Sequence, residues 1–168
     1  MNKRALHQRI LEQLQAGMEL YFKAARTAHA EATDPQSKAE NKYDTRGLEA
    51  SYLARGQSRQ AAETEDAIVQ LQAMPLRDFL PDDAIDLGAI VTLEPAAKAR
   101  GPGRKAVAAV YFVAPKGGGT EVEMDGTEVT VITPQSPLGS QLLGKRRGHR
   151  VTIGEGPSST AYTVGAVA

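Results

Sequence analysis

The sequence predicts an α+β fold, with an N-terminal antiparallel two-helix coiled-coil hairpin followed by an antiparallel β domain that carries one short helix. Two observations support this prediction. The spacing of apolar residues changes near Pro75 from helical steps to short strands separated by turn signals. One helix signal then interrupts the strands. The expected divisions are a hairpin over residues 1–75, a linker over 76–86 and a sheet domain over 87–168.

The first helix is predicted over about residues 3–32. Apolar or small residues recur there at alternating steps of three and four, which places them on one face of a helix. They are Leu11, Leu14, Met18, Tyr21, Ala25, Ala28 and Ala32. Thr33-Asp34-Pro35 ends this helix, because proline disfavours helical geometry at the residue before it.

The second helix is predicted over about residues 46–73, from a series with the same spacing: Ala50, Leu53, Gln57, Ala61, Thr64, Ile68 and Leu71. Two helices joined by a polar connection form an antiparallel hairpin, each arm about 40 Å long at 1.5 Å per residue. The seam is apolar near the open end and small or polar toward the connection. This pattern predicts a projecting finger whose outer faces carry Lys23, Arg26, Arg55 and Arg59, although such charges can also simply solvate a helix.

The second half reads as short strands over 89–93, 106–113, 129–133, 151–153 and 161–167, rich in Val, Ile, Thr and Tyr. Glycine-containing turns such as Asp125-Gly126 separate them. The short helix is predicted over 136–143, with Ser136 as N-cap, Pro137 at the first helical position and Gly144 in the left-handed conformation that ends it.

Composition excludes several classes of function. The 20 basic and 20 acidic residues cancel, with eleven of each in residues 1–79 and nine of each in 80–168, so direct DNA or RNA binding is disfavoured. There is no cysteine for a disulfide or a thiolate metal site. No apolar run approaches the roughly 20 residues of a membrane span, and the N-terminus lacks a signal-peptide core. We therefore expect a cytoplasmic protein without a membrane partner.

The glycine-rich loops and the histidines do not predict a catalytic site. Gly101-Pro102-Gly103 and Gly117-Gly118-Gly119 lack the spacing and the following helix of a phosphate-binding loop, and are better explained as hairpin loops. The three histidines lack metal-ligand spacing, and no serine lies in a nucleophile elbow.

The connection between the helices is more suggestive, because it carries carboxylates at the end of a long lever: Asp34, Glu40, Asp44 and Glu49. Carboxylate oxygens are ligands that Mg²⁺ prefers, usually in a shell shared with other groups. The alternative is helix capping, in which Asp44 or Thr45 starts the second helix and acids favour its first turn.

Two sections resemble the GreA/GreB family of bacterial transcription elongation factors. The segment from Ile132 to Ile153, which contains Ser136-Pro137-Leu138-Gly139 and Leu142-Leu143-Gly144-Lys145, is similar to the family's S-P-[LI]-[AG]-x-x-[LI]-[LI]-G-[KR] segment. Glu49-Ala50-Ser51-Tyr52-Leu53-Ala54-Arg55 is similar to the family's stretch just past the hairpin tip. The resemblance covers essentially the whole chain and implies an FKBP-like C-terminal domain.

The resemblance implies a factor that docks its C-terminal domain on bacterial RNA polymerase and inserts the hairpin into the secondary channel. Ser136, Pro137 and Leu138, together with Arg55 and Arg59, would then contact the polymerase, although Leu138 could instead pack in the core. Such a protein is an auxiliary factor, not an enzyme. We expect a monomer without a cofactor of its own, which meets nascent RNA only within the polymerase complex.

Asp44 and Glu49 are the tip acids that the resemblance would make catalytic, holding Mg²⁺ only jointly with the polymerase during transcript cleavage. The chain departs from the family pattern here. Aligning Tyr52 with the family tyrosine puts Thr45 and Leu48 at the acidic positions, so that each acid lies one residue outside them.

Two other functions remain open at this point. One is a regulator or inhibitor that occupies the channel without stimulating cleavage. The other is a peptidyl-prolyl isomerase, which an FKBP-like domain brings to mind. The isomerase is disfavoured because such a pocket is lined by aromatic side chains, and beyond residue 80 the chain offers only Tyr111, Phe112 and Tyr162.

Overall fold

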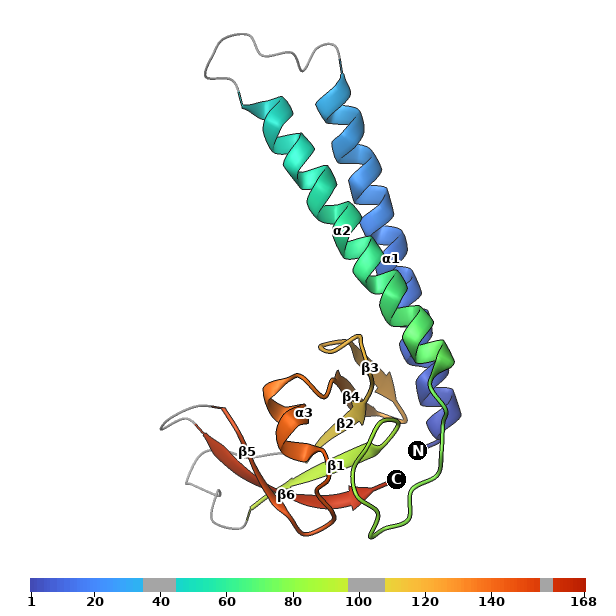
Figure 1. Ribbon diagram of the computed structural model, residues 1–168, viewed down its shortest axis with the longest axis vertical. Helices are drawn as coiled ribbons and strands as arrows, with labels where there is room; N and C mark the ends of the chain where they lie inside the picture. Colours follow the sequence, from blue (N-terminus) through green and yellow to red (C-terminus); the bar gives the residue numbers. More distant parts are fainter. Residues whose placement is uncertain (35–44, 97–107, 155–158) are drawn as a thin grey trace.

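The computed structural model describes residues 1–34, 45–96, 108–154 and 159–168. It consists of a long helical hairpin, a six-stranded sheet and one short helix (Figure 1). The elements are α1 (Lys3–Thr33), α2 (Arg46–Ala73), β1 (Ile90–Pro95), β2 (Ala109–Val113), β3 (Glu121–Met124), β4 (Thr127–Ile132), α3 (Pro137–Leu142), β5 (Arg150–Ile153) and β6 (Thr160–Val167). The α+β class and the order of the modules are as predicted.

The seam of the hairpin follows the predicted residues closely on α1, where Leu14, Ala25 and Ala28 are buried. On α2 the prediction was wrong at Leu53, which is 53% exposed. Its neighbour Ala54 is partly buried instead. Between residues 50 and 61, the buried or partly buried positions on α2 are therefore 50, 54, 57 and 61. Ala54 lies in the seam, and Leu53 is exposed to solvent.

The sheet has the order β3-β4-β2-β1-β6-β5 and is mixed, not antiparallel as predicted. The exception is β2, which pairs in parallel with β4, so that Val110 lies opposite Val129. The prediction failed because β3 was missed. This edge strand is only four residues long, has two exposed glutamates and buries only Val122. β3 forms the edge of the sheet. The chain then reverses through a two-residue turn, and β4 lies between β3 and β2.

The Asp125-Gly126 turn between β3 and β4 was predicted and is confirmed. Met124 pairs with Thr127, and both turn residues have positive φ, 54° for Asp125 and 72° for Gly126. Positive φ at both central positions is the geometry of the tight hairpin turn that Asp-Gly favours.

The two faces of the sheet are both buried, because successive side chains of a strand point to opposite faces. On one face, Phe112, Val129 and Val131 pack with Leu6, Ile10 and Leu71 at the base of the hairpin. On the other face, Val91, Val113 and Val164 pack with Leu142 of α3. The hairpin base and the sheet thus share one apolar core.

Residues 76–86 pack against this assembly, where the sequence suggested a linker. Phe79 and Ile85 are buried in the core on the α3 side. Lys3 donates a 2.6 Å hydrogen bond to the carbonyl of Arg77, and its ammonium lies 4.5 Å from the centre of the Phe79 ring. Burial lowers the pKa of Lys3, and the nearby Asp78 carboxylate opposes this shift. The segment therefore fastens the start of α1 to the sheet domain.

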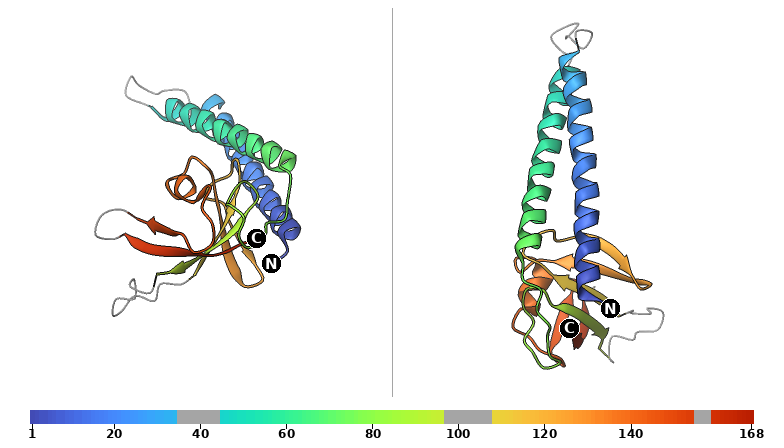
Figure 2. Two further views of the ribbon diagram at one scale, coloured as in Figure 1. Left: turned by 60° about the horizontal axis from the view of Figure 1, so that its bottom comes forward. Right: turned by 90° about the vertical axis from the view of Figure 1, so that its right-hand side faces the viewer.

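Beyond this shared core, the hairpin projects away from the sheet domain, and its far end is bordered by no other described element (Figure 2). Its seam there consists of small residues such as Ala25, Ala28 and Ala50. The predicted finger is confirmed.

Candidate functional site

One of the two predicted tip acids lies at the described far end of the hairpin. Glu49 is exposed in the first turn of α2, and its Oε1 accepts a 2.7 Å hydrogen bond from the Thr45 hydroxyl. Thr45 is the N-cap residue, as the capping alternative allowed, but its side chain does not bond a backbone N–H of the helix. Asp44 lies outside the described residues. Glu49 therefore lies near the tip, in the first turn of α2, where the helix dipole stabilises a carboxylate.

One outer stripe of α2 combines apolar and cationic side chains. Leu48, Tyr52, Arg55 and Arg59 follow steps of four, three and four, which brings them onto one face. Leu48 is 55% and Tyr52 65% exposed. Arg59 forms a 2.8 Å ion pair with Glu63, a hydrogen bond that raises the pKa of its guanidinium. The sequence analysis identified both arginines but missed the apolar part of the stripe, which their common spacing could have revealed.

The predicted docking residues Ser136, Pro137 and Leu138 form the corner between β4 and α3. The Ser136 hydroxyl accepts a 3.0 Å hydrogen bond from the Gly139 N–H and donates a 2.7 Å bond to the Thr133 carbonyl. Pro137 is exposed at the start of α3. The predicted cap is confirmed, and Gly144 has the expected left-handed φ of 75°.

Leu138 lies partly buried against the core on the α3 side of the sheet. Its packing favours the alternative that Leu138 belongs to the core. The exposed surface of the corner is therefore supplied mainly by Pro137, held in place by the Ser136 cap.

The carboxamide of Gln141 joins α3 to the edge strand β5. Its Nε2 donates a 3.2 Å hydrogen bond to the carbonyl of Thr152, and its Oε1 accepts a 3.2 Å bond from the N–H of the same residue. These are the two backbone groups that an edge strand leaves without a ladder partner. Gln141 therefore covers the edge at this point and fixes α3 beside β5.

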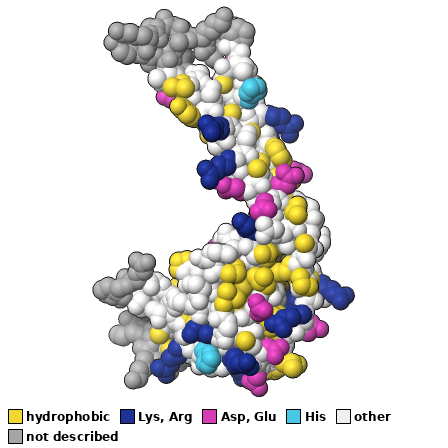
Figure 3. Space-filling model, in the orientation of Figure 1, with side chains coloured by type: hydrophobic (Ala, Val, Ile, Leu, Met, Phe, Trp, Pro, Cys, Tyr) yellow, Lys and Arg dark blue, Asp and Glu magenta, His cyan; other side chains and the backbone are white. Residues whose placement is uncertain are grey.

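Residues 144–150, which lead from α3 into the first residue of β5, are rich in basic side chains and are called the basic turn. It carries Lys145, Arg146, Arg147 and Arg150 around His149. All except Lys145 are exposed. Figure 3 shows Lys and Arg side chains gathered near a histidine at the lower end of the molecule. These cations were not among the predicted site residues, although four cations in six positions of the sequence were the available signal.

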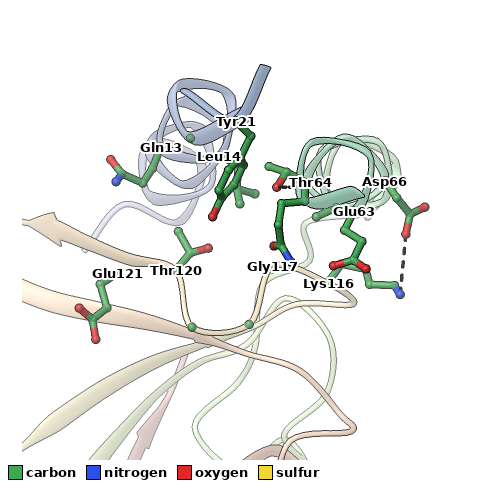
Figure 4. A pocket seen from close by; sticks show the side chains of 15 residues that line it. Gln13, Leu14, Tyr21, Glu63, Thr64, Asp66, Lys116, Gly117, Thr120 and Glu121 are labelled. Atoms are coloured by element: carbon green, nitrogen blue, oxygen red, sulfur yellow. Dashed lines mark hydrogen bonds and ion pairs between the residues drawn. The ribbon is translucent and has the colours of Figure 1, made fainter. Parts of the chain in front are cut away.

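A polar crevice of about 800 Å³ separates the hairpin from the loop of Gly117, Gly118 and Gly119 (Figure 4). Lys116 and Asp66 form a 3.7 Å ion pair across it, both about half exposed. The acids Glu63 and Glu121 also line it, so that the loop does not offer a phosphate a positive surrounding. The loop leads into a strand, not a helix, as expected for a loop that binds no phosphate. The predicted hairpin is wrong here, because the loop joins β2 to β3 and these strands lie on opposite sides of β4.

Of the three aromatic residues considered for an isomerase pocket, only the two tyrosines share a face of the sheet. Phe112 is fully buried on the face that the hairpin covers, whereas Tyr111 and Tyr162 lie on the opposite face with α3. Tyr111 is only half buried, and this burial raises the pKa of its phenol. The geometry does not support the isomerase alternative.

Within residues 1–34, 45–96, 108–154 and 159–168, no group of three or more metal-ligating side chains could hold an ion. None of the helices in this part of the chain combines the length and apolar character that a membrane crossing requires.

Comparison with known proteins found no matching family model and no matching curated protein. Among solved structures, the GreA factor homolog 1 (Gfh1) of Thermus thermophilus is 20% identical, with 96% of this chain and 94% of that chain covered at a TM-score of 0.36. Gfh1 of Thermus aquaticus is 21% identical, with 95% and 92% covered and a TM-score of 0.37. A further structure of the transcription factor Gfh1 is 20% identical, with 96% and 92% covered and a TM-score of 0.38. These three solved structures are all of Gfh1, a likeness that by itself assigns no activity or partner.

Proposed function

We propose that this protein is an RNA polymerase-binding factor that inserts its hairpin into the secondary channel of a bacterial polymerase. One observation carries the proposal: a finger with a narrow, alanine-rich seam stands on a sheet domain that shares a core with its base. With 31 residues, α1 is about 46 Å long at 1.5 Å per residue, and its part beyond the shared core belongs to the finger. A projecting hairpin adds little to a function that is carried out on the protein's own surface, but it can enter a deep channel of a partner.

The corner at Ser136 and Pro137 is the proposed docking surface of the sheet domain, in agreement with the resemblance of its sequence to the GreA/GreB segment. The outer stripe of Leu48, Tyr52, Arg55 and Arg59 is proposed to contact the wall of the channel. Aromatic and arginine side chains are enriched at the centres of protein interfaces, which suits this stripe.

The first test is binding of the purified protein to core RNA polymerase at low salt. The expected result is a stable complex that a variant shortened at the hairpin tip still forms through its sheet domain. A protein that fails to bind core polymerase under these conditions would contradict the proposal.

Stimulation of transcript cleavage is the finer part of the proposal. Glu49 supplies one exposed carboxylate near the tip, and Asp44 would add the second. Neither forms a full Mg²⁺ shell alone, so any metal would be held jointly with polymerase groups. Glu49→Ala and Asp44→Ala should retain polymerase binding and lose cleavage of backtracked transcripts, whereas Glu65→Ala, on the same helix but far from the tip, should retain both.

A channel-occupying regulator without cleavage activity is the second candidate. The 2.7 Å bond from Thr45 to Glu49 favours it, because this carboxylate is already engaged within its own helix turn. The cleavage assay on the unmodified protein separates the two candidates. If the protein binds polymerase and never accelerates cleavage, the regulator is the correct description.

A further inference from the structure

Among the described residues, no carboxylate forms an ion pair with a side chain of the basic turn 144–150. Lys145, Arg147 and Arg150 form no ion pair with any residue in the described part of the chain. Arg146 donates a hydrogen bond to the backbone carbonyl of Asp82, not to a carboxylate. In a chain with equal numbers of acids and bases, four neighbouring cations without carboxylate partners repel one another.

The backbone of this turn is anchored to the core on both sides. The Gly144 N–H donates a 2.9 Å bond to Ile85, whose own N–H donates a 2.7 Å bond to Lys145. The Gly148 N–H donates a 2.8 Å hydrogen bond to the Val164 carbonyl, and the Val164 N–H donates a 2.8 Å hydrogen bond to the His149 carbonyl. Ile85 and Val164 are each 1% exposed. The turn is therefore a fixed platform, and a partner would meet cations whose backbone needs no ordering on binding.

The turn is also continuous with the proposed docking corner. It connects α3 directly to β5, and the paired hydrogen bonds of Gln141 with Thr152 hold these two elements together. The corner at Pro137, helix α3 and the basic turn therefore follow one another along the chain as one anchored segment.

We propose that residues Lys145, Arg146, Arg147 and Arg150 form a cationic docking site for an acidic protein segment of the polymerase, next to the surface that receives the Pro137 corner. This inference rests on the proposed function, because it names the chemistry of the partner at the same docking surface. It makes docking electrostatically steered even though the chain as a whole has no net charge.

A protein segment fits this turn better than a nucleic-acid backbone does. Arg146 lies against Asp82, and the adjoining segment carries Asp83 and Asp86. The four cations occupy only six positions of a chain without net charge, whereas a run of phosphates calls for a broad basic surface. A short acidic segment of a folded partner is small enough to contact only these four cations.

The test compares two double variants of equal net charge. Arg147→Glu with Arg150→Glu reverses the turn, whereas Arg4→Glu with Arg9→Glu reverses two exposed arginines at the start of α1. Affinity for core RNA polymerase is measured across a series of salt concentrations, and thermal unfolding confirms that each variant is folded. We expect the turn variant to lose about tenfold in affinity at low salt and to show a flatter salt dependence, with the control close to the unmodified protein.

The outcomes separate the alternatives. If the unmodified protein binds polymerase and the turn variant binds equally well with the same salt dependence, the inference is wrong and the proposed function stands. If the unmodified protein does not bind polymerase, both fail. Binding of a short DNA duplex or single-stranded RNA without polymerase, lost in the turn variant, would overturn the acidic-segment assignment in favour of nucleic acid.

Discussion

The base and the far end of the hairpin are built from the same two helices, yet they are stabilised differently. At the base, Leu6, Ile10 and Leu71 are completely buried against the sheet. At the far end, the helices meet through alanines such as Ala25 and Ala50, and bulky residues such as Leu53 remain outside. Burial of apolar area contributes most to stability, so the base should hold the fold while the far end contributes less to it.

The largest expected effect is at the base. Ile10→Ala removes a fully buried side chain from the core that the hairpin and the sheet share, and should cost about 2–5 kcal/mol in the free energy of unfolding. Leu53→Ala is the matched control at the far end and should change it by less than about 0.5 kcal/mol. Chemical denaturation of both variants measures the difference, and equal costs would remove the distinction between the two regions.

A change in the alanine seam should act on the finger without unfolding the sheet domain. Ala61 is fully buried between the helices, so Ala61→Leu should force them apart at a cost of about 1–3 kcal/mol. Ala62→Leu places the same side chain on the exposed face and serves as control. Hydrogen exchange should accelerate in the far part of the hairpin only. In the unmodified protein, the described residues from Ala25 to Arg55 should already exchange faster than the sheet, and uniform protection would contradict this comparison.

The corner at Ser136 should show a smaller effect. Ser136→Ala removes both hydrogen bonds of the hydroxyl and should lower stability by about 1 kcal/mol. Ser140→Ala, one turn along the exposed side of α3, is the control, since its hydroxyl bonds only the neighbouring Pro137 carbonyl. Thermal unfolding measures both. An unchanged midpoint for Ser136→Ala would mean that the cap is replaceable by water.

The smallest expected effect is at the crevice between the hairpin and the glycine loop. Lys116→Gln breaks the 3.7 Å ion pair with Asp66, but both side chains are about half exposed, so the loss should stay below about 1 kcal/mol. The effect should shrink further as salt is added. A larger loss that resists salt would show that this contact, and not only the apolar base, fixes the hairpin to the sheet.

The candidate site was predictable where its signals are local. The Ser136 cap, the Gly144 stop and the position of Glu49 in the first turn of the second helix follow from residue types a few positions apart. The bonds from Gln141 to Thr152 could not be predicted, because they join residues whose proximity depends on how α3 lies on the sheet. The anchoring of the basic turn to Ile85 and Val164 is of the same kind.

The sequence by itself determined the two helices, their stop near Thr33, the small-residue seam and the Asp125-Gly126 turn. Each of these depends on periodicity or on local backbone preference. Only the tertiary structure decided that β4 enters beside β2 in parallel, that Ala54 and not Leu53 faces the seam, and that Phe79 and Ile85 pack on the sheet. These features depend on contacts between distant segments, where the burial of apolar area outweighs the preferences of any single stretch of chain.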